Sequence, residues 1–183
     1  MQKTNYFELL EELASLSTRA VFLATGGSRQ LLQKAQAEIN SLRLRASETV
    51  CSLELSLFTD FLPPLERRSI AEAAHKISKI IERSSQVIFQ KLQRPSYDKR
   101  SKESDVSLKL AELLEKELSL LKKIKKPNQT PDVIKFRKIL NEARTLSRSS
   151  QKKQTPYALS MSELREELSD CFDAIVEIML CNI

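Results

Sequence analysis

The chain has 183 residues, of which 41% are hydrophobic and 30% are charged, so it can bury a substantial core beneath a polar surface. It contains only two glycines, and aromatic residues make up 5%. These values argue against a turn-rich β fold and against aromatic platforms that stack on single-stranded nucleic acid. The net charge of +6 comes from 30 basic and 24 acidic residues, so the chain is basic without being a polycation.

Apolar residues recur every three or four positions in six segments, which is the spacing of a buried helix face. In chain order the segments cover residues 6–23, 32–57, 65–92, 106–124, 133–146 and 164–183. Gly26-Gly27 is expected to end the first helix in the left-handed conformation. Ser104, Thr130-Pro131 and a Ser160–Glu163 capping box supply start signals for the last three helices, the last of them after a polar loop over residues 148–156.

Pro63-Pro64 predicts a sharp hinge between the second and third helices, because proline lacks an N–H and its ring clashes with the preceding turn. Pro64 suits the first turn of the next helix. Residues 95–103 are polar and basic and are interpreted as a linker between residues 1–95 and 103–183. Since short connections favour antiparallel neighbours, we predict a single all-α domain over residues 1–183, a six-helix up-and-down bundle of two three-helix halves.

The excess positive charge gathers at residues 94–102, 122–126 and 152–153. We favour solvated loop charge and helix-end lysines that complement the helix dipole. A patch for acidic lipid headgroups or nucleic acid stays open as the sharper alternative. No base-reading motif accompanies the charge, so a nucleic-acid partner is not expected.

The three cysteines are Cys51, Cys171 and Cys181, and no C-x-x-C motif occurs. This usage is typical of reduced thiols that act as small core hydrophobes. Acidic residues within 8–12 interrupt the first apolar run, so we expect no signal peptide. No stretch approaches the ~18 apolar residues of a membrane span. We expect a cytoplasmic protein, with a peripheral position on the inner membrane face as an alternative.

Candidate catalytic groups are scarce. His75 is the only histidine, and a lone helical histidine is more often structural than catalytic. Glu166, Asp170 and Asp173 stand four and three residues apart, which places them on one helix face. Carboxylates on facing helices of a bundle can bind a metal ion, but a single helix supplies too few ligands. A solvated acidic face is therefore favoured, and a metal site is the alternative.

The hinge sequence FLPPLERRSI at residues 61–70 resembles the signature of the PhoU-like phosphate transport regulators, in the single-chain branch associated with Pit-type phosphate permeases. The matching positions are Phe61, Pro64, Leu65, Arg67 and Ile70. Residues 6–12, 141–143 and 166–170 are also similar to short stretches of that family. The resemblance implies two three-helix bundles in one domain and a regulator that contacts a membrane permease.

The family's proposed metal sites use paired acidic residues on inner helices, and this chain departs from that pattern. Ser47 and Arg144 stand where aspartates are expected, and Cys51 stands where a further polar ligand often does. Residues 74–79 carry His75 and two lysines in place of an aspartate run. Lysine and arginine remove both the ligands and the negative field that hold a cation. We therefore hypothesise that a multinuclear site is lost and that no cofactor is used, with a weakly bound divalent or ferric ion at Glu166, Asp170 and Asp173 as the alternative.

Taken together, the residues and the resemblance predict a non-enzymatic regulator or accessory protein of phosphate transport. Its expected partner is a Pit-type phosphate permease or another membrane transporter. The alternative is a helical adaptor or structural bundle that has lost metal binding and transport regulation. A metal-dependent enzyme is the weakest hypothesis, because few carboxylates and one histidine remain. Long amphipathic helices also leave a homo-oligomer open.

Overall fold

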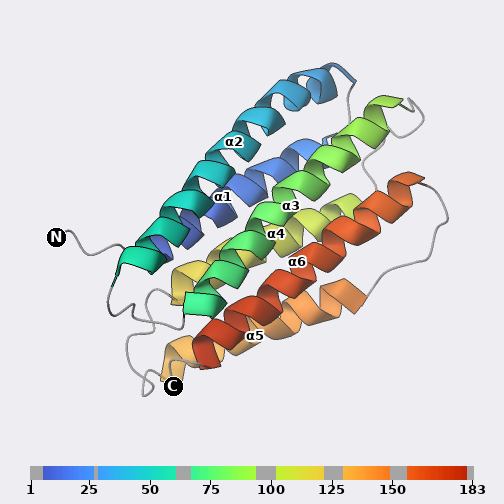
Figure 1. Ribbon diagram of the computed structural model, residues 1–183. Coiled ribbons are helices and arrows are strands. Elements are labelled where there is room, and N and C mark those ends of the chain that lie inside the picture. The colour runs from blue at the N-terminus through green and yellow to red at the C-terminus, as the bar shows by residue number, and fades with distance from the viewer. Residues whose placement is uncertain are drawn as a thin grey trace.

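The computed structural model describes residues 6–26, 29–60, 67–93, 102–121, 130–148 and 156–180. These residues form six α-helices and no strand (Figure 1). The helices are α1 (Tyr6–Thr25), α2 (Arg29–Thr59), α3 (Arg67–Gln93), α4 (Lys102–Leu121), α5 (Thr130–Arg148) and α6 (Pro156–Leu180). The predicted all-α six-helix bundle is confirmed.

Successive helices run in opposite directions, and α1, α3, α4 and α6 occupy the middle of the bundle (Figure 1). Helix α3 packs against α1, α2 and α6, while α1 packs against α2, α3 and α4. The outer helices α2 and α5 lie on opposite sides of the molecule (Figure 1). The main contacts between the α1–α3 group and the α4–α6 group are therefore α1 with α4 and α3 with α6.

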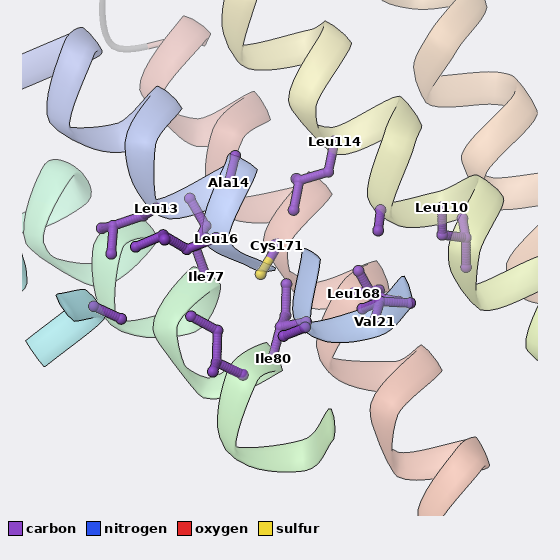
Figure 2. Close-up of a cluster of buried hydrophobic side chains, with 14 of the residues drawn as sticks. Leu13, Ala14, Leu16, Val21, Ile77, Ile80, Leu110, Leu114, Leu168 and Cys171 are labelled. Atoms are coloured by element: carbon purple, nitrogen blue, oxygen red, sulfur yellow. The ribbon is translucent and has the colours of Figure 1, made fainter. Parts of the chain in front are cut away.

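The centre of the core lies where α1, α3, α4 and α6 meet (Figure 2), and buried residues of α2 and α5 extend it. Leucines and isoleucines from all four helices interdigitate there, and each buried side chain of this size contributes roughly 1.5–3 kcal/mol relative to an exposed one. The fully buried members include Leu13, Ile77, Ile80, Leu110, Leu164, Leu168 and Cys171. They belong to the apolar stripes identified in the sequence, so those stripes are the buried helix faces. Cys171 is a core side chain as predicted, whereas Cys51 is exposed.

The first helix ends where the sequence predicts, but by a different conformation. Helix α1 ends at Thr25, and the Gly26 N–H donates to the Leu23 carbonyl oxygen over 3.3 Å. No described glycine has a positive φ, so Gly26 does not use the left-handed conformation. A Cβ at Gly26 would lie 3.3 Å from that same carbonyl oxygen, which makes the turn tight for any larger residue.

Two later helices begin before their predicted caps. Helix α6 begins at Pro156, so the predicted Ser160–Glu163 capping box lies inside the helix. Proline suits a first helical position because its missing N–H would have no partner there. Helix α4 begins at Lys102, and Ser104 is therefore within its first turn. The Ser104 hydroxyl is buried 3.3 Å from Tyr157 Oη, where it joins α4 to α6.

Lys91 joins three helices at one end of the bundle. Its side chain is 1% exposed, and Nζ donates a 2.9 Å hydrogen bond to the Gly26 carbonyl oxygen just after α1. The same ammonium group lies 5.5 Å from the centre of the Tyr157 ring in α6. A cation is favourable at a helix C-terminus and over an aromatic face, so both contacts offset the cost of burying the charge.

None of the described helices combines the length and the hydropathy required to cross a bilayer.

Candidate functional site

The predicted acidic face of α6 is present and open to solvent. Glu166, Asp170 and Asp173 are all exposed. Asp173 Oδ1 lies 3.4 Å from Arg144 Nη2 of α5, so one of the three carboxylates faces a cation of the chain itself. Among the described residues, no three His, Cys, Asp or Glu side chains converge as a metal site requires.

Glu167, next to this face, forms ion pairs with two basic side chains of α3. Its Oε1 lies 2.7 Å from Lys79 Nζ and 3.3 Å from Arg83 Nε. Arg83 also reaches Glu163 Oε2 at 3.3 Å. The Glu167 side chain is only 9% exposed, so these pairs are less screened than surface ion pairs worth about 0–1 kcal/mol. Basic residues of α3 therefore act as internal partners for α6 carboxylates.

The hinge signature is described at two of its five positions. Phe61, Pro64 and Leu65 lie within residues 61–66, outside the described part of the chain. Arg67 Nη2 donates a 2.6 Å hydrogen bond to the Asp60 carbonyl oxygen, and Ile70 is fully buried. Arg67 thus holds the end of α2, and Ile70 anchors the start of α3 in the core. The basic stretches 94–101, 122–126 and 152–153 also lie outside the described residues.

A groove of about 890 Å³ lies between α2 and α3. Its lining includes Ser47, Cys51, Glu54, His75, Lys79 and Glu82, and therefore brings together the departures from the acidic pattern noted in the sequence at residues 47, 51 and 74–79. His75 Nε2 lies 2.8 Å from Glu54 Oε1 across the groove, and both side chains are exposed. No hydrogen bond joins the described Cys51 thiol to His75, although an activated nucleophile needs its base within hydrogen-bond reach. The His75 imidazole in this groove therefore pairs with Glu54 and not with the Cys51 thiol.

Three large apolar side chains, Leu44, Leu55 and Phe58, form an exposed row on α2; we call them the α2 row. They are 69%, 64% and 87% exposed, respectively. Their separations of eleven and three residues correspond to about three turns and one turn of helix, so they share a face. Leu44 lines the α2–α3 groove, and Phe58 lines a second hollow that includes Arg67 and Arg68. Large apolar side chains this exposed on one helix face are candidates for an interaction site.

One buried carboxylate, Glu117 of α4, was not identified from the sequence. It is fully buried, and neither carboxylate oxygen has a hydrogen-bond partner among the described residues. Burial raises the pKa of Glu117 to about 9, against the lowering effect of Arg144, and Asp173 raises it further. The signal was present, because residue 117 continues the apolar stripe through Leu110 and Leu114. A glutamate at such a position is a core residue that must be protonated or paired.

Comparison with protein-family models finds no match to this chain, and no curated protein sequence matches it. The similarity of the hinge to the PhoU-like regulators therefore rests on the residues quoted above.

Proposed function

We propose that the chain is a non-enzymatic regulatory or accessory protein that acts by protein–protein contact through its α2–α3 face. This face consists of the α2 row and the adjoining groove. The α2 row carries the proposal: covering each of its side chains would contribute roughly 1.5–3 kcal/mol to association. The groove adds charged and polar groups of both signs beside Leu44, and such groups confer specificity more than affinity.

The hinge resemblance supports a membrane phosphate permease of the Pit type as the partner. The match includes Arg67 and Ile70, and Arg67 lines the same hollow as Phe58 of α2. A regulator of this kind works at the cytoplasmic face of the membrane. The alternative partner is a protein unrelated to transport, in which case the chain is a helical adaptor that uses the same α2–α3 face.

Site-directed photo-crosslinking tests the face. A photoreactive residue at Leu44 or Phe58 should capture the partner in cells. The same residue at Leu31, which is 60% exposed on a different side of α2, should capture little. Equal capture at Leu31 and Phe58 would contradict the proposed face. The variant Leu44→Ser/Phe58→Ser should lose the partner, while Leu31→Ser should retain it.

Phosphate uptake separates the two partner classes. Deleting the gene should change uptake at high or low phosphate if the partner is a permease, and Leu44→Ser/Phe58→Ser should reproduce that change. Unchanged uptake under both conditions, together with a non-transport protein crosslinked at Phe58, would favour the adaptor.

A further inference from the structure

A second groove, of about 510 Å³, lies between α4 and α5 and has a different character from the first. Leu120 and Ile139 provide its apolar floor, and Lys116, Lys135 and Lys138 line it with their long side chains. All three lysines are exposed. Lysine stems cover apolar surface while their ammonium groups stay in water, so the groove presents an apolar floor with a cationic rim.

The surroundings of this groove extend both properties. Glu115 is the one carboxylate among the described residues that line it. Lys116 and Lys138 form no ion pair with another described residue, so their charge is not neutralised within this part of the structure. On α5, Ile134 stands one turn before Lys138 on the same side of the helix and is 48% exposed. We call Lys116, Lys135, Lys138 and Ile134 the α4–α5 basic face.

We propose that the α4–α5 basic face docks on a bilayer that contains anionic phospholipid. The charge complementarity is direct, because headgroup phosphates bind lysine and arginine at the leaflet surface. The exposed isoleucine and the apolar floor suit the boundary between headgroups and acyl chains, where a purely electrostatic contact would need no apolar group. An acidic protein is the competing occupant.

This inference goes beyond the proposed function and does not depend on it. Figure 1 places α5 on the side of the bundle opposite α2. A protein bound to lipid through α4 and α5 would therefore keep its α2–α3 face available to a partner. The variant Leu44→Ser/Phe58→Ser should bind vesicles as the unmodified protein does, so the two proposals fail separately.

Vesicle co-sedimentation of the full chain tests the proposal. Vesicles of phosphatidylcholine with about one third phosphatidylglycerol should bind the protein, and pure phosphatidylcholine should bind it weakly. Raising the salt from about 0.1 M to about 0.5 M should release most of it, because the Debye length shortens. Absence of binding to the anionic vesicles at the lower salt would overturn the proposal.

Matched variants locate the contact. Lys116→Gln/Lys138→Gln should weaken partitioning about 25-fold, since each basic residue near an anionic surface contributes about fivefold. Lys34→Gln/Arg43→Gln removes the same charge from exposed positions on α2 and should change partitioning little. Equal losses in the two variants would show that net charge alone acts and would overturn the assignment. All four side chains are exposed, and circular dichroism checks that each variant keeps its helices.

A synthetic acidic amphipathic helix tests the competing occupant. If it binds the protein and Lys116→Gln/Lys138→Gln abolishes that binding while vesicle binding is unaffected, the face recognises protein and the lipid proposal is wrong. If vesicles bind and the peptide does not displace them, the proposal stands.

Discussion

Tyr6 Oη donates a 2.5 Å hydrogen bond to Asp60 Oδ2, which ties the first turn of α1 to the end of α2. The same phenol oxygen lies 3.1 Å from the Ser56 carbonyl oxygen, and the tyrosine is 1% exposed. Arg67 reaches the Asp60 carbonyl oxygen from the start of α3. Asp60 is therefore held by α1 and by α3 where the chain enters the hinge.

The variant Tyr6→Phe should lower the free energy of unfolding by about 1.5–3 kcal/mol, the usual contribution of a hydrogen bond to a charged group. Urea unfolding measures the loss. Asp60→Asn is the partner control, and the double variant should lose less than the sum of the single losses, because the two side chains share one interaction. Strictly additive losses would mean that the contact does not stabilise the fold.

Tyr6 also predicts a pH dependence at the alkaline end. Burial, followed by the Asp60 hydrogen bond, raises the pKa of Tyr6 from 10.0 to about 12. The folded state therefore keeps the phenol proton that the unfolded chain releases between these values. Its contribution is complete below pH 10 and is lost as the pH rises towards 12. Tyr6→Phe should remove this component of alkaline destabilisation, and unfolding monitored across that range is the measurement.

Because of Glu117, the free energy of unfolding should fall as the pH rises through neutrality. Its pKa of about 9 in the folded protein exceeds the ordinary 4.5, mainly because of burial. Between these values the folded protein holds a proton that the unfolded chain has released, so the contribution is complete below pH 4.5 and is lost towards pH 9. The loss by pH 7 is roughly 3 kcal/mol. Glu117→Gln, which cannot ionise, should gain stability relative to the unmodified protein as the pH is raised.

Urea unfolding at several pH values gives the slope of the free energy of unfolding against pH for each variant. The control is Glu112→Gln, an exposed glutamate on the same helix, which should leave the slope of the parent protein unchanged. Replacement by leucine at position 117 should stabilise the protein at neutral pH, since it removes an unpartnered carboxyl group from the core. Identical slopes for the parent and Glu117→Gln would contradict the buried, protonated state.

The sequence predicts the buried helix faces, but it does not predict the surroundings of a single polar residue such as Glu117. Periodicity identifies a buried face because every member of the face shares one property, so residues such as Ile77 and Leu168 were predicted correctly. Whether a polar residue in or beside such a stripe meets a partner depends on which helix covers it, and that is a tertiary fact. Glu117 lies within an apolar stripe and Glu167 beside one; the first is covered without a partner among the described residues, and the second pairs with Lys79 and Arg83.

The first residue of a helix is also difficult to predict from local sequence alone. Ser160 satisfied the pattern of a capping box, yet α6 begins at Pro156. The extra turn places Tyr157 against Ser104 and over the buried Lys91 ammonium group. A contact between distant residues therefore outweighs the preference of a local cap.

Protein purified without chelator should contain no stoichiometric metal, and EDTA should leave its melting temperature unchanged. The reason is that Lys79 and Arg83 of α3 pair with Glu167, the neighbour of Glu166, while Arg144 faces Asp173. Cations supplied by the chain oppose the binding of a further cation. Elemental analysis by mass spectrometry is the measurement. Stoichiometric iron, zinc or calcium that disappears on Asp170→Asn would restore the metal site considered for Glu166, Asp170 and Asp173.

The two described cysteines should differ sharply in reactivity. Cys51 is exposed on α2, whereas Cys171 is fully buried in the core, where burial raises the pKa of its thiol. The thiolate is the reactive form, so a disulfide reagent should modify Cys51 rapidly and Cys171 only when the bundle opens. A Cys181→Ser background isolates the pair, because Cys181 lies outside the described residues.

In that background, Cys51→Ser should abolish the fast phase of modification by the disulfide reagent. Cys171 should then react only when urea unfolds the protein. The rate of that second reaction should follow the stability of the core: it should slow in variants that stabilise the bundle, such as replacement of Glu117 by leucine, and quicken in Tyr6→Phe. Rapid modification of Cys171 in the native protein would mean that α3 and α6 separate readily, because their contact is what covers this thiol.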